Sequence, residues 1–476
     1  IMHSARFLAS RLVSSEVSPL FHRFSGCLVT NTPRPSGCIT LRKTAKIPSR
    51  KITTTSSRCA QPASSAFDDH AALYADHNWS RSIPITDVSK DPDAKMVVVQ
   101  WEDGDSQRYP NVWLKSNCHC EGCYSKGAHG KLKYTQHLDL DIQADVVSIT
   151  QDGQVLAIKW SDGHMTSVPS NWLRCNRFDQ SDRDPVADAK LDLWGSDVMS
   201  SSRLRTFEFD ELMQSDEALL DWLSEIKVLG ISLVKNAPKM SHQIHKLADR
   251  VGYITPSTFG THSDVMVVEG GDMLGFSNGY LMPHTDFSYY VSPPGVALFH
   301  CIKNTSTVGG DSLLIDGFKA AMELKTDHHD AFNMLTKHEI EHVAISVNKK
   351  ITQQGFYHHA RHPLIRLDAL GQLKQITFNE IYHASLFRVP VDDVIPMFSA
   401  IKAFNKILLR DDNVFKYKMK EGDILTFNNH RMLHGRSAFS TDIGSVERHL
   451  QTCFVEWDCV LSKLRVLKKS PSENLE

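Results

Sequence analysis

Three residues constrain this chain most: His284 and Asp286, two positions apart, and His434, which lies 150 residues beyond His284. Residues i and i+2 of a strand point to the same side, so His284 and Asp286 are expected on one face of a strand. His434 must then come from a distant strand that the fold brings alongside. Two imidazoles and one carboxylate on one face of a metal leave the other face open. That is the ligand set of a non-haem Fe(II) oxygenase, in which 2-oxoglutarate and O2 fill the vacant positions.

The His-x-Asp pattern alone is a weak signal, because the chain has 24 histidines. The alternative interpretation is a surface histidine next to a solvated aspartate. Composition sets the frame for choosing between them. The 476 residues are 41% hydrophobic and 23% charged, which is ordinary globular composition with enough length for two domains.

The charge balance and hydropathy exclude some classes of partner. The net charge of -2 predicts no broad nucleic-acid or membrane footprint. No apolar run reaches the roughly 18 residues that a membrane span needs. Ten cysteines in a chain of this length do not indicate a disulfide scaffold.

The first 66 residues differ from the rest, with Glu16 as their one acidic residue against ten lysines and arginines and many serines and threonines. An arginine-rich, serine-rich and acid-poor start is typical of an organellar transit peptide. Residues 1–67 are therefore predicted to be a transit or disordered segment. The mitochondrial matrix is the first expectation and a plastid the second; a basic tail without an address would leave the protein in the cytoplasm.

Beyond this segment we predict a small β-rich domain over residues 90–180, a polar linker over 181–204, and a larger domain over 205–470. In the small domain, residues 96–101 read as a strand, and residues 146–150 and 155–160 as a hairpin around Asp152 and Gly153. No internal repeat is expected.

The larger domain alternates short β-rich runs with turns. Helices are expected within residues 210–226, near 241–251 with Ser241 as N-cap, and around 391–409. Many short strands that carry His284, Asp286 and His434 indicate a double-stranded β-helix, a jelly-roll-like barrel. The predicted fold class is mainly β with flanking helices.

Cys118, Cys120 and Cys123 offer three thiolates within six residues. Zinc takes four ligands in a tetrahedron, and a closed site is structural. His164, which follows the Asp162-Gly163 turn, is the favoured fourth ligand. The other choices are His119 and Cys175, and two alternatives to a zinc site remain: an iron–sulfur cluster, or three cysteines with no metal role.

Two further residues fit a carboxylate cosubstrate. Arg448 lies 14 residues after His434, an even number of strand positions, so it is expected on the same face of its strand pair as the metal site. A guanidinium can bind the far carboxylate of 2-oxoglutarate bidentately, and Ser312 can add a hydroxyl. Arg436 competes for this role, and a surface salt bridge is the alternative use of Arg448.

The chain resembles the γ-butyrobetaine/trimethyllysine hydroxylases over about residues 95–467. The resemblance rests on separate motifs in the family's order: PHTD at 283–286, PPGV at 293–296, LFHC at 298–301, GGDS at 309–312, IDGF at 315–318, LHGR at 433–436, RHL at 448–450 and WD at 457–458. The cysteines of the small domain with His164 continue it.

This resemblance implies a small zinc-bearing domain joined to a double-stranded β-helix, and hydroxylation in the carnitine pathway with Fe(II), 2-oxoglutarate and O2. It also implies a homodimer, with ascorbate as a supporting reductant. Residues 448–450 are similar to the butyrobetaine branch, whereas the transit-like segment is similar to the mitochondrial trimethyllysine branch. The expected substrate is thus a small quaternary-ammonium acid, γ-butyrobetaine first and trimethyllysine second.

The cage for the trimethylammonium departs from the family. Positions that hold tyrosines and a tryptophan there match an altered set here: Phe259, Ser263, Phe276 and Phe454. Phe287 also lacks a hydroxyl, while Asn379 stands where the family contacts the substrate carboxylate. A phenylalanine cage still attracts a cation. The alternatives are plain core packing for these residues, a less cationic substrate, and a non-catalytic scaffold that uses the zinc domain for binding.

Overall fold

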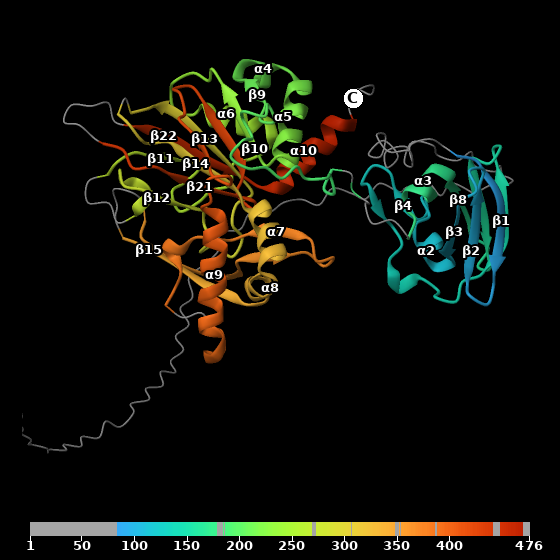
Figure 1. Ribbon diagram of the computed structural model, residues 1–476. Helices are drawn as coiled ribbons and strands as arrows, with labels where there is room; N and C mark the ends of the chain where they lie inside the picture. The colour runs from blue at the N-terminus through green and yellow to red at the C-terminus, as the bar shows by residue number, and fades with distance from the viewer. Residues whose placement is uncertain are drawn as a thin grey trace, which may run out of the picture. The chain divides into compact units, whose positions relative to one another are not determined.

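The computed structural model describes residues 83–178, 184, 186–268, 273–305, 307–347, 352, 354–385, 388–440 and 448–469 (Figure 1). The predicted transit segment, residues 1–67, lies outside these residues. None of the helices in the described part of the chain is both long and apolar enough to cross a bilayer.

The small domain consists of two three-stranded antiparallel sheets, each followed by a short helix, with a two-stranded hairpin between them. The first unit comprises β1 (Ile85–Asp91), β2 (Met96–Trp101), β3 (Ser106–Pro110) and α2 (Asn111–Ser116). The second comprises β6 (Ala144–Thr150), β7 (Val155–Trp160), β8 (Met165–Pro169) and α3 (Ser170–Cys175). The hairpin is β4 (Tyr124–Ser125) and β5 (Gly130–Lys131), followed by the short helix η2 (Thr135–His137).

These two units are an internal repeat with an offset of 59 residues, so the expectation of no repeat was wrong. The matched positions share a Trp, an Asp-Gly turn, a Pro and a Trp-Leu pair. Both units carry a β-bulge at the same place, opposite Trp101 in the first and opposite Trp160 in the second. Most of the matched positions hold different residues, which explains why the repeat is faint in the sequence.

The two units also hold each other through exchanged charges. Lys115 of the first unit pairs with Asp162 of the second at 2.7 Å, and Arg174 pairs with Asp103 at 3.0 Å. Each cation follows its unit's last strand, and each carboxylate lies in the other unit's turn. The core between them is built around the buried Trp101 and Trp160.

The larger domain is a double-stranded β-helix with flanking helices, as predicted. A six-stranded sheet has the order β11-β22-β13-β20-β10-β9 and a four-stranded sheet the order β12-β21-β14-β19. The strands of the first sheet are β9 (Thr206–Glu208), β10 (Ile231–Lys235), β11 (Ser263–Val265), β13 (Val296–Lys303), β20 (Ile424–Asn428) and β22 (His449–Val455). Those of the second are β12 (Leu281–His284), β14 (Ser312–Asp316), β19 (Phe415–Tyr417) and β21 (Met432–Arg436).

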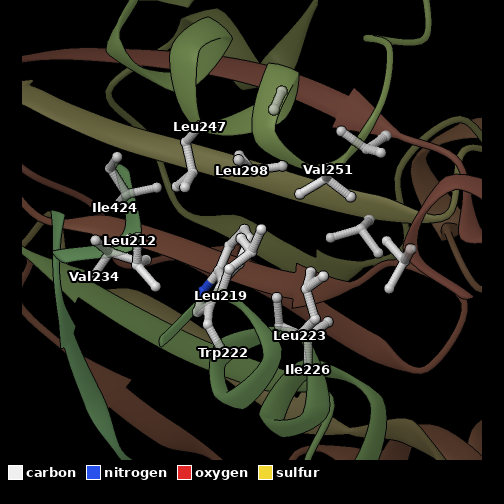
Figure 2. Close-up of a cluster of buried hydrophobic side chains, with 14 of the residues drawn as sticks. Leu212, Leu219, Trp222, Leu223, Ile226, Val234, Leu247, Val251, Leu298 and Ile424 are labelled. Carbon is white, nitrogen blue, oxygen red and sulfur yellow. The ribbon is translucent and has the colours of Figure 1, made fainter. Parts of the chain in front are cut away.

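Four helices pack against the six-stranded sheet: α4 (Phe209–Gln214), α5 (Asp216–Val228), α6 (Gln243–Val251) and α10 (Trp457–Lys469). Figure 2 shows the hydrophobic cluster beneath them, with Trp222 from α5, Leu247 from α6 and Leu298 from β13. The helix expected within 210–226 is two helices, because Ser215 adopts an extended conformation and its hydroxyl caps α5. The N-cap of α6 is His242 rather than Ser241.

A long insertion between β14 and β19 carries the remaining elements. Its helices α7 (Gly317–Asp327), α8 (His329–Lys337) and α9 (Val394–Leu408) pack together, as Figure 1 shows in yellow and orange. The strands pair as two hairpins, β15 (Glu339–Ser346) with β16 (Phe356–Pro363) and β17 (Ile365–Leu367) with β18 (Leu373–Ile376). The insertion also contains the short helices η4 (Glu380–Tyr382) and η5 (Val391–Asp393). The short helix η3 (Leu274–Phe276) lies outside the insertion, before β12.

Part of the segment expected as a linker belongs to the larger domain. Trp194 and Val198 are buried in the cluster that also contains Phe427 of β20. The backbone amide of Trp194 donates to Asp316, which is itself paired with Arg431 at 2.7 Å in a fully buried ion pair. Composition alone predicted a linker here, because many residues around Trp194 in the sequence are polar.

Candidate functional site

His284, Asp286 and His434 lie together between the two sheets. His284 is the last residue of β12 and is the register partner of His434 in β21, so the two rings stand side by side with centroids 4.5 Å apart. The Asp286 carboxylate is 3.4 Å from Nε2 of His284 and 3.5 Å from Nε2 of His434. Asp286 lies in the turn after β12 rather than on the strand, so the turn and not strand alternation aims its carboxylate.

Local contacts hold the three donors in place. Nδ1 of His284 lies 2.8 Å from the backbone oxygen of Met282, which turns Nε2 toward the cluster. Asn429 accepts a hydrogen bond from the Asp286 amide at 2.8 Å and donates one to the Asp286 carbonyl at 3.1 Å. Asn429 was not anticipated from the sequence, since only the folded chain places it beside a residue 143 positions away. Second-shell contacts of this kind fix the orientation of metal ligands.

The electrostatics favour a cation. Burial would raise the pKa of Asp286, but His434 and His284 bring it below its ordinary value. Burial lowers the pKa of His434 to about 4, so both the carboxylate and the imidazole present free lone pairs near neutral pH. Neutral imidazole and ionised carboxylate are the forms that bind divalent metals. The donor set and its spacing therefore fit one ferrous ion.

A cavity of about 150 Å³ opens from this cluster, a volume that suits a small molecule. Both sheets contribute to its wall, the six-stranded sheet through Phe299 and Leu450 and the four-stranded sheet through Ser312. All the side chains proposed for cosubstrate and substrate line it: Arg448, Ser312, Phe259, Ser263, Phe276, Phe287, Asn379 and Phe454.

Arg448 and Arg436 both reach the cavity but differ in their partners. Arg436 donates to the backbone oxygens of Ser277 at 2.5 Å and Gly279 at 2.9 Å. Arg448 is 6% exposed and has no hydrogen-bond or ion-pair partner among the described residues. It precedes β22, a strand of the six-stranded sheet, so the reasoning that placed it on a strand pair with His434 was wrong even though it reaches the same cavity.

The altered family positions suggested a cage without tyrosine, but two tyrosines line the cavity. Tyr289 and Tyr382 line the cavity with ring centroids 4.9 Å apart in an edge-to-face arrangement. Phe287 joins them to the phenylalanines, 5.8 Å from Tyr289 and 5.1 Å from Phe454. Burial raises the pKa of Tyr289 well above its ordinary value, so its hydroxyl stays protonated. The sequence signal that was overlooked is the aromatic run directly after Asp286.

Asn379 is almost fully buried and already engaged. Its side-chain oxygen accepts from the amide of Ile381 at 3.2 Å, and its side-chain nitrogen donates to the carbonyl of Thr285 at 3.4 Å. It caps η4, the short helix that ends with the cavity residue Tyr382. Asn379 thus also positions the wall of the cavity.

The cysteine cluster of the small domain contains four donors. Nε2 of His164 lies 3.2 Å from Sγ of Cys118, 3.7 Å from Cys120 and 3.6 Å from Cys123. His119 turns its Nδ1 to the carbonyl of Asn117 at 2.9 Å and is not part of this group.

Cys175, the other alternative for a fourth ligand, is buried elsewhere, and burial raises its pKa to about 11. Burial and the neighbouring thiols raise the pKa of Cys123 to about 12. A bound cation would reverse this repulsion, because a metal deprotonates the thiols that it binds. Three thiols and one imidazole are a tetrahedral donor set of the zinc class.

The cysteine cluster includes position 118 of the first unit and position 164 of the second. The repeat places a different pair of residues at the two corresponding positions. Position 118 of the first unit matches Arg177 of the second, and position 164 matches Asp105. Arg177 and Asp105 form an ion pair at 2.8 Å. The two symmetry-related corners are thus both cross-linked, one by Cys118 and His164 and the other by opposite charges.

Two family models match the chain: the taurine catabolism dioxygenase TauD, TfdA family over residues 188–454, and the gamma-butyrobetaine hydroxylase-like N-terminal domain over residues 88–174. Gamma-butyrobetaine dioxygenase of Homo sapiens is 31% identical over 79% of this chain and 95% of its own length. Mitochondrial trimethyllysine dioxygenase of Homo sapiens is 28% identical over 76% of this chain and 83% of its own length. Among solved structures, the non-heme iron oxygenase OrfP aligns over 53% of this chain and 94% of its own, with a TM-score of 0.40 and 14% identity.

The match to the dioxygenase model covers more than half of the chain and includes the two histidines and the aspartate that converge between its sheets. The match to the N-terminal model includes all four donors of the cysteine cluster. The chain therefore belongs to the TauD, TfdA family and, within it, to the γ-butyrobetaine/trimethyllysine hydroxylases, which are Fe(II)/2-oxoglutarate-dependent dioxygenases.

Proposed function

We propose that this protein hydroxylates an unactivated C–H bond of a small quaternary-ammonium acid, with γ-butyrobetaine as first substrate and carnitine as product. The observation that carries the proposal is the aromatic cavity that begins at His284, Asp286 and His434. Trimethyllysine is the second candidate. Ser263, which leaves one side of the cage without a ring, keeps a less cationic substrate as the third.

In this proposal His284, Asp286 and His434 hold Fe(II), which, with 2-oxoglutarate and O2, supplies the oxidising power for hydroxylation. All three side chains line the cavity, so an ion that they hold would be accessible from it. Arg448 takes the far carboxylate of 2-oxoglutarate, because its guanidinium is buried and has no hydrogen-bond or ion-pair partner among the described residues. Ser312, in the strand next to His434, adds a hydroxyl on the same side. A charge-assisted pair in a buried site is a strong orienting contact.

The aromatic wall binds and orients the substrate. Rings of Phe259, Phe276 and Phe454 with Tyr289 and Tyr382 offer π faces to a trimethylammonium group. Their contact also excludes water from the reacting carbon, and the tyrosine hydroxyls give the cage its polar contacts. Orientation of a substrate near the reacting centre is where the protein contributes most to rate.

The proposal extends to the second metal, the assembly and the location of the protein. Cys118, Cys120, Cys123 and His164 hold a structural zinc ion, and ascorbate keeps the iron reduced. The protein works as a homodimer in the mitochondrial matrix. The mitochondrial name of the trimethyllysine relative and the basic composition of residues 1–66 support this location.

The test is succinate release by the full chain with Fe(II), ascorbate and 2-oxoglutarate on a panel that includes γ-butyrobetaine and trimethyllysine. We expect release that depends on one betaine, with a 16-dalton gain in its mass. His434→Ala should abolish this coupled turnover, because two remaining donors hold iron poorly. An unimpaired His434→Ala enzyme would remove His434 from the iron site, and no betaine-dependent release in iron-loaded protein would refute the substrate.

A further inference from the structure

A third group of metal-binding side chains lies beside the cavity, formed by His242, His245 and His262. One ligand atom from each lies within 4.8 Å of the other two. The ring centroids form a nearly equilateral triangle, with separations of 4.8, 4.9 and 4.9 Å. Three imidazoles around one point are uncommon packing for side chains that gain a charge when protonated.

The start of α6 presents two of these rings. His242 is the N-cap residue, with a left-handed φ of 70°, and His245 is in the first turn. Residues i and i+3 of a helix lie on one face, and the opposite face of α6 is buried through Ile244 and Leu247 in the hydrophobic cluster of Figure 2. The histidine face is thus fixed by the packing of the other face.

The third ring comes from the segment that leads into β11. His262 precedes Ser263, the first residue of that strand, and β11 pairs with β22. Gln451 of β22 joins the two elements, because it accepts a hydrogen bond from the His242 amide at 2.6 Å and donates one to Asp264 at 3.0 Å. Asp264 also lies 3.9 Å from Nε2 of His262. A carboxylate behind a histidine is a common second shell of metal sites.

Two of the ring nitrogens make no hydrogen bond within the described residues. Nδ1 of His245 and Nδ1 of His262 are buried, without a hydrogen-bond partner among the described residues. Burial and the neighbouring His262 and His242 lower the pKa of His245, while Asp249 and Asp264 act in the opposite direction.

We propose that His242, His245 and His262 bind a transition-metal ion of the zinc class, in addition to the iron and cysteine sites. Imidazole donors suit Zn(II), Cu(II) and Ni(II). With Zn–N bonds of about 2.0–2.1 Å, tetrahedral ligand nitrogens lie about 3.4 Å apart, so side-chain rotations close the cluster around the ion. The exposed His242 leaves the fourth position to water or a small anion.

A metal at this site would act on the cavity wall. His262 lines the cavity together with Thr261 and Ser263, and the same segment carries Phe259. An ion held by His242, His245 and His262 cross-links this segment to α6. The proposed consequence is a stiffer wall, visible as slower amide exchange over residues 257–265 when zinc is added.

The experiment compares the full iron-loaded chain with His242→Asn, under anaerobic conditions, by zinc titration against a competing chelator and by metal analysis. Asparagine tolerates the left-handed φ of this exposed position, so the variant should fold. The cysteine and iron sites are common to both proteins, so the difference isolates the third site. His329→Asn, an exposed histidine of α8, is the matched control.

We expect the parent and His329→Asn to bind one more zinc ion per chain than His242→Asn. The affinity of the third site should fall more than ~10-fold, since loss of even a second-shell partner costs that much. Zinc should slow exchange at residues 257–265 in the parent and in His329→Asn, but not in His242→Asn. Equal zinc stoichiometry and affinity in all three proteins would overturn the proposal. His262→Asn should repeat the loss; parental zinc binding by that variant would also count against it.

Discussion

The candidate metal sites of the small domain and of the oxygenase domain differ in how the chain builds them. The cysteine cluster takes three donors from residues 118–123 and one from His164, and its four donors surround a point. The iron site takes His284 from the end of β12, Asp286 from the turn that follows and His434 from β21, and its three donors face the cavity. A closed set of four ligands suits a structural ion, whereas a set of three with an open side suits a reactive one.

The difference indicates which interactions stabilise each of the two domains. The small domain has a core between two repeated units and a cluster of three cysteines and one histidine at one corner. The iron site instead sits on a framework that a buried ion pair and two packed sheets hold without a metal. We therefore expect metal removal to unfold the small domain and to leave the oxygenase domain folded.

The largest effect should follow Cys118→Ser. A structural zinc ion contributes on the order of 10 kcal/mol to the folding of a small module, which equals a domain's whole stability. Zinc analysis should show the loss of one ion, and amide exchange over residues 83–178 should accelerate throughout. Cys175→Ser is the matched control, since Cys175 is also buried but lies outside the cluster. A zinc-free yet protected Cys118→Ser domain would erase the contrast between the two sites.

Next in size is the ion pair that supports the iron site. Asp316 accepts from Arg431 at 2.7 and 3.0 Å and also caps α7, and both side chains are fully buried. Asp316→Ala leaves a buried guanidinium without its partner, which typically costs about 3–5 kcal/mol.

Urea unfolding of the oxygenase domain measures this cost, with Asp221→Ala as the control. Asp221 pairs with Arg205 on the surface, where such a pair contributes at most ~1 kcal/mol. Equal losses in the two variants would mean that the buried pair does not support the site.

Acid should destabilise the oxygenase domain through a buried histidine. Burial lowers the pKa of His300 to about 4, and its ring nitrogens have no partner among the described residues. The unfolded chain, with a histidine pKa near 6.5, therefore binds more protons than the folded chain between pH 6.5 and 4. The oxygenase domain should lose stability as pH falls through this window, by about 3 kcal/mol from His300 alone.

His300→Leu removes this titration, so its unfolding free energy should fall less steeply from pH 6.5 to 4 than that of the parent. His329→Asn should keep the parent slope, because its ring is exposed. An unchanged slope in His300→Leu would mean that the histidine is already protonated at little cost in the folded state.

The sequence predicted the residues that chemistry restricts and missed those that folding brings together. His284, Asp286 and His434 could be found because few residue types bind iron and strand pairing limits their spacing. Asn429 and Tyr382 could not be found, since their role depends on contacts between distant segments.

The fold shows the same limit. The β-helix followed from many short strands, but Trp194 was assigned to a linker because polar residues surround it. The repeat was missed because most matched positions differ, and identical pairs such as Trp101 and Trp160 are few. Arg448 was predicted through strand parity, although it lies just before β22 of the other sheet, so its place in the cavity owed nothing to that argument.

The smallest expected effect is on the affinity for 2-oxoglutarate, which tests the role of Arg448 in the cavity. Arg448→Lys keeps the positive charge but cannot bind a carboxylate bidentately. The apparent 2-oxoglutarate requirement should rise about 10-fold, equal to about 1.4 kcal/mol, with little change in the maximal rate. Arg205→Lys, a surface change in the same domain, should leave both values unchanged. An arginine that binds the carboxylate of 2-oxoglutarate acts first on the affinity for 2-oxoglutarate. A lower maximal rate with an unchanged 2-oxoglutarate requirement would therefore place Arg448 against the substrate instead.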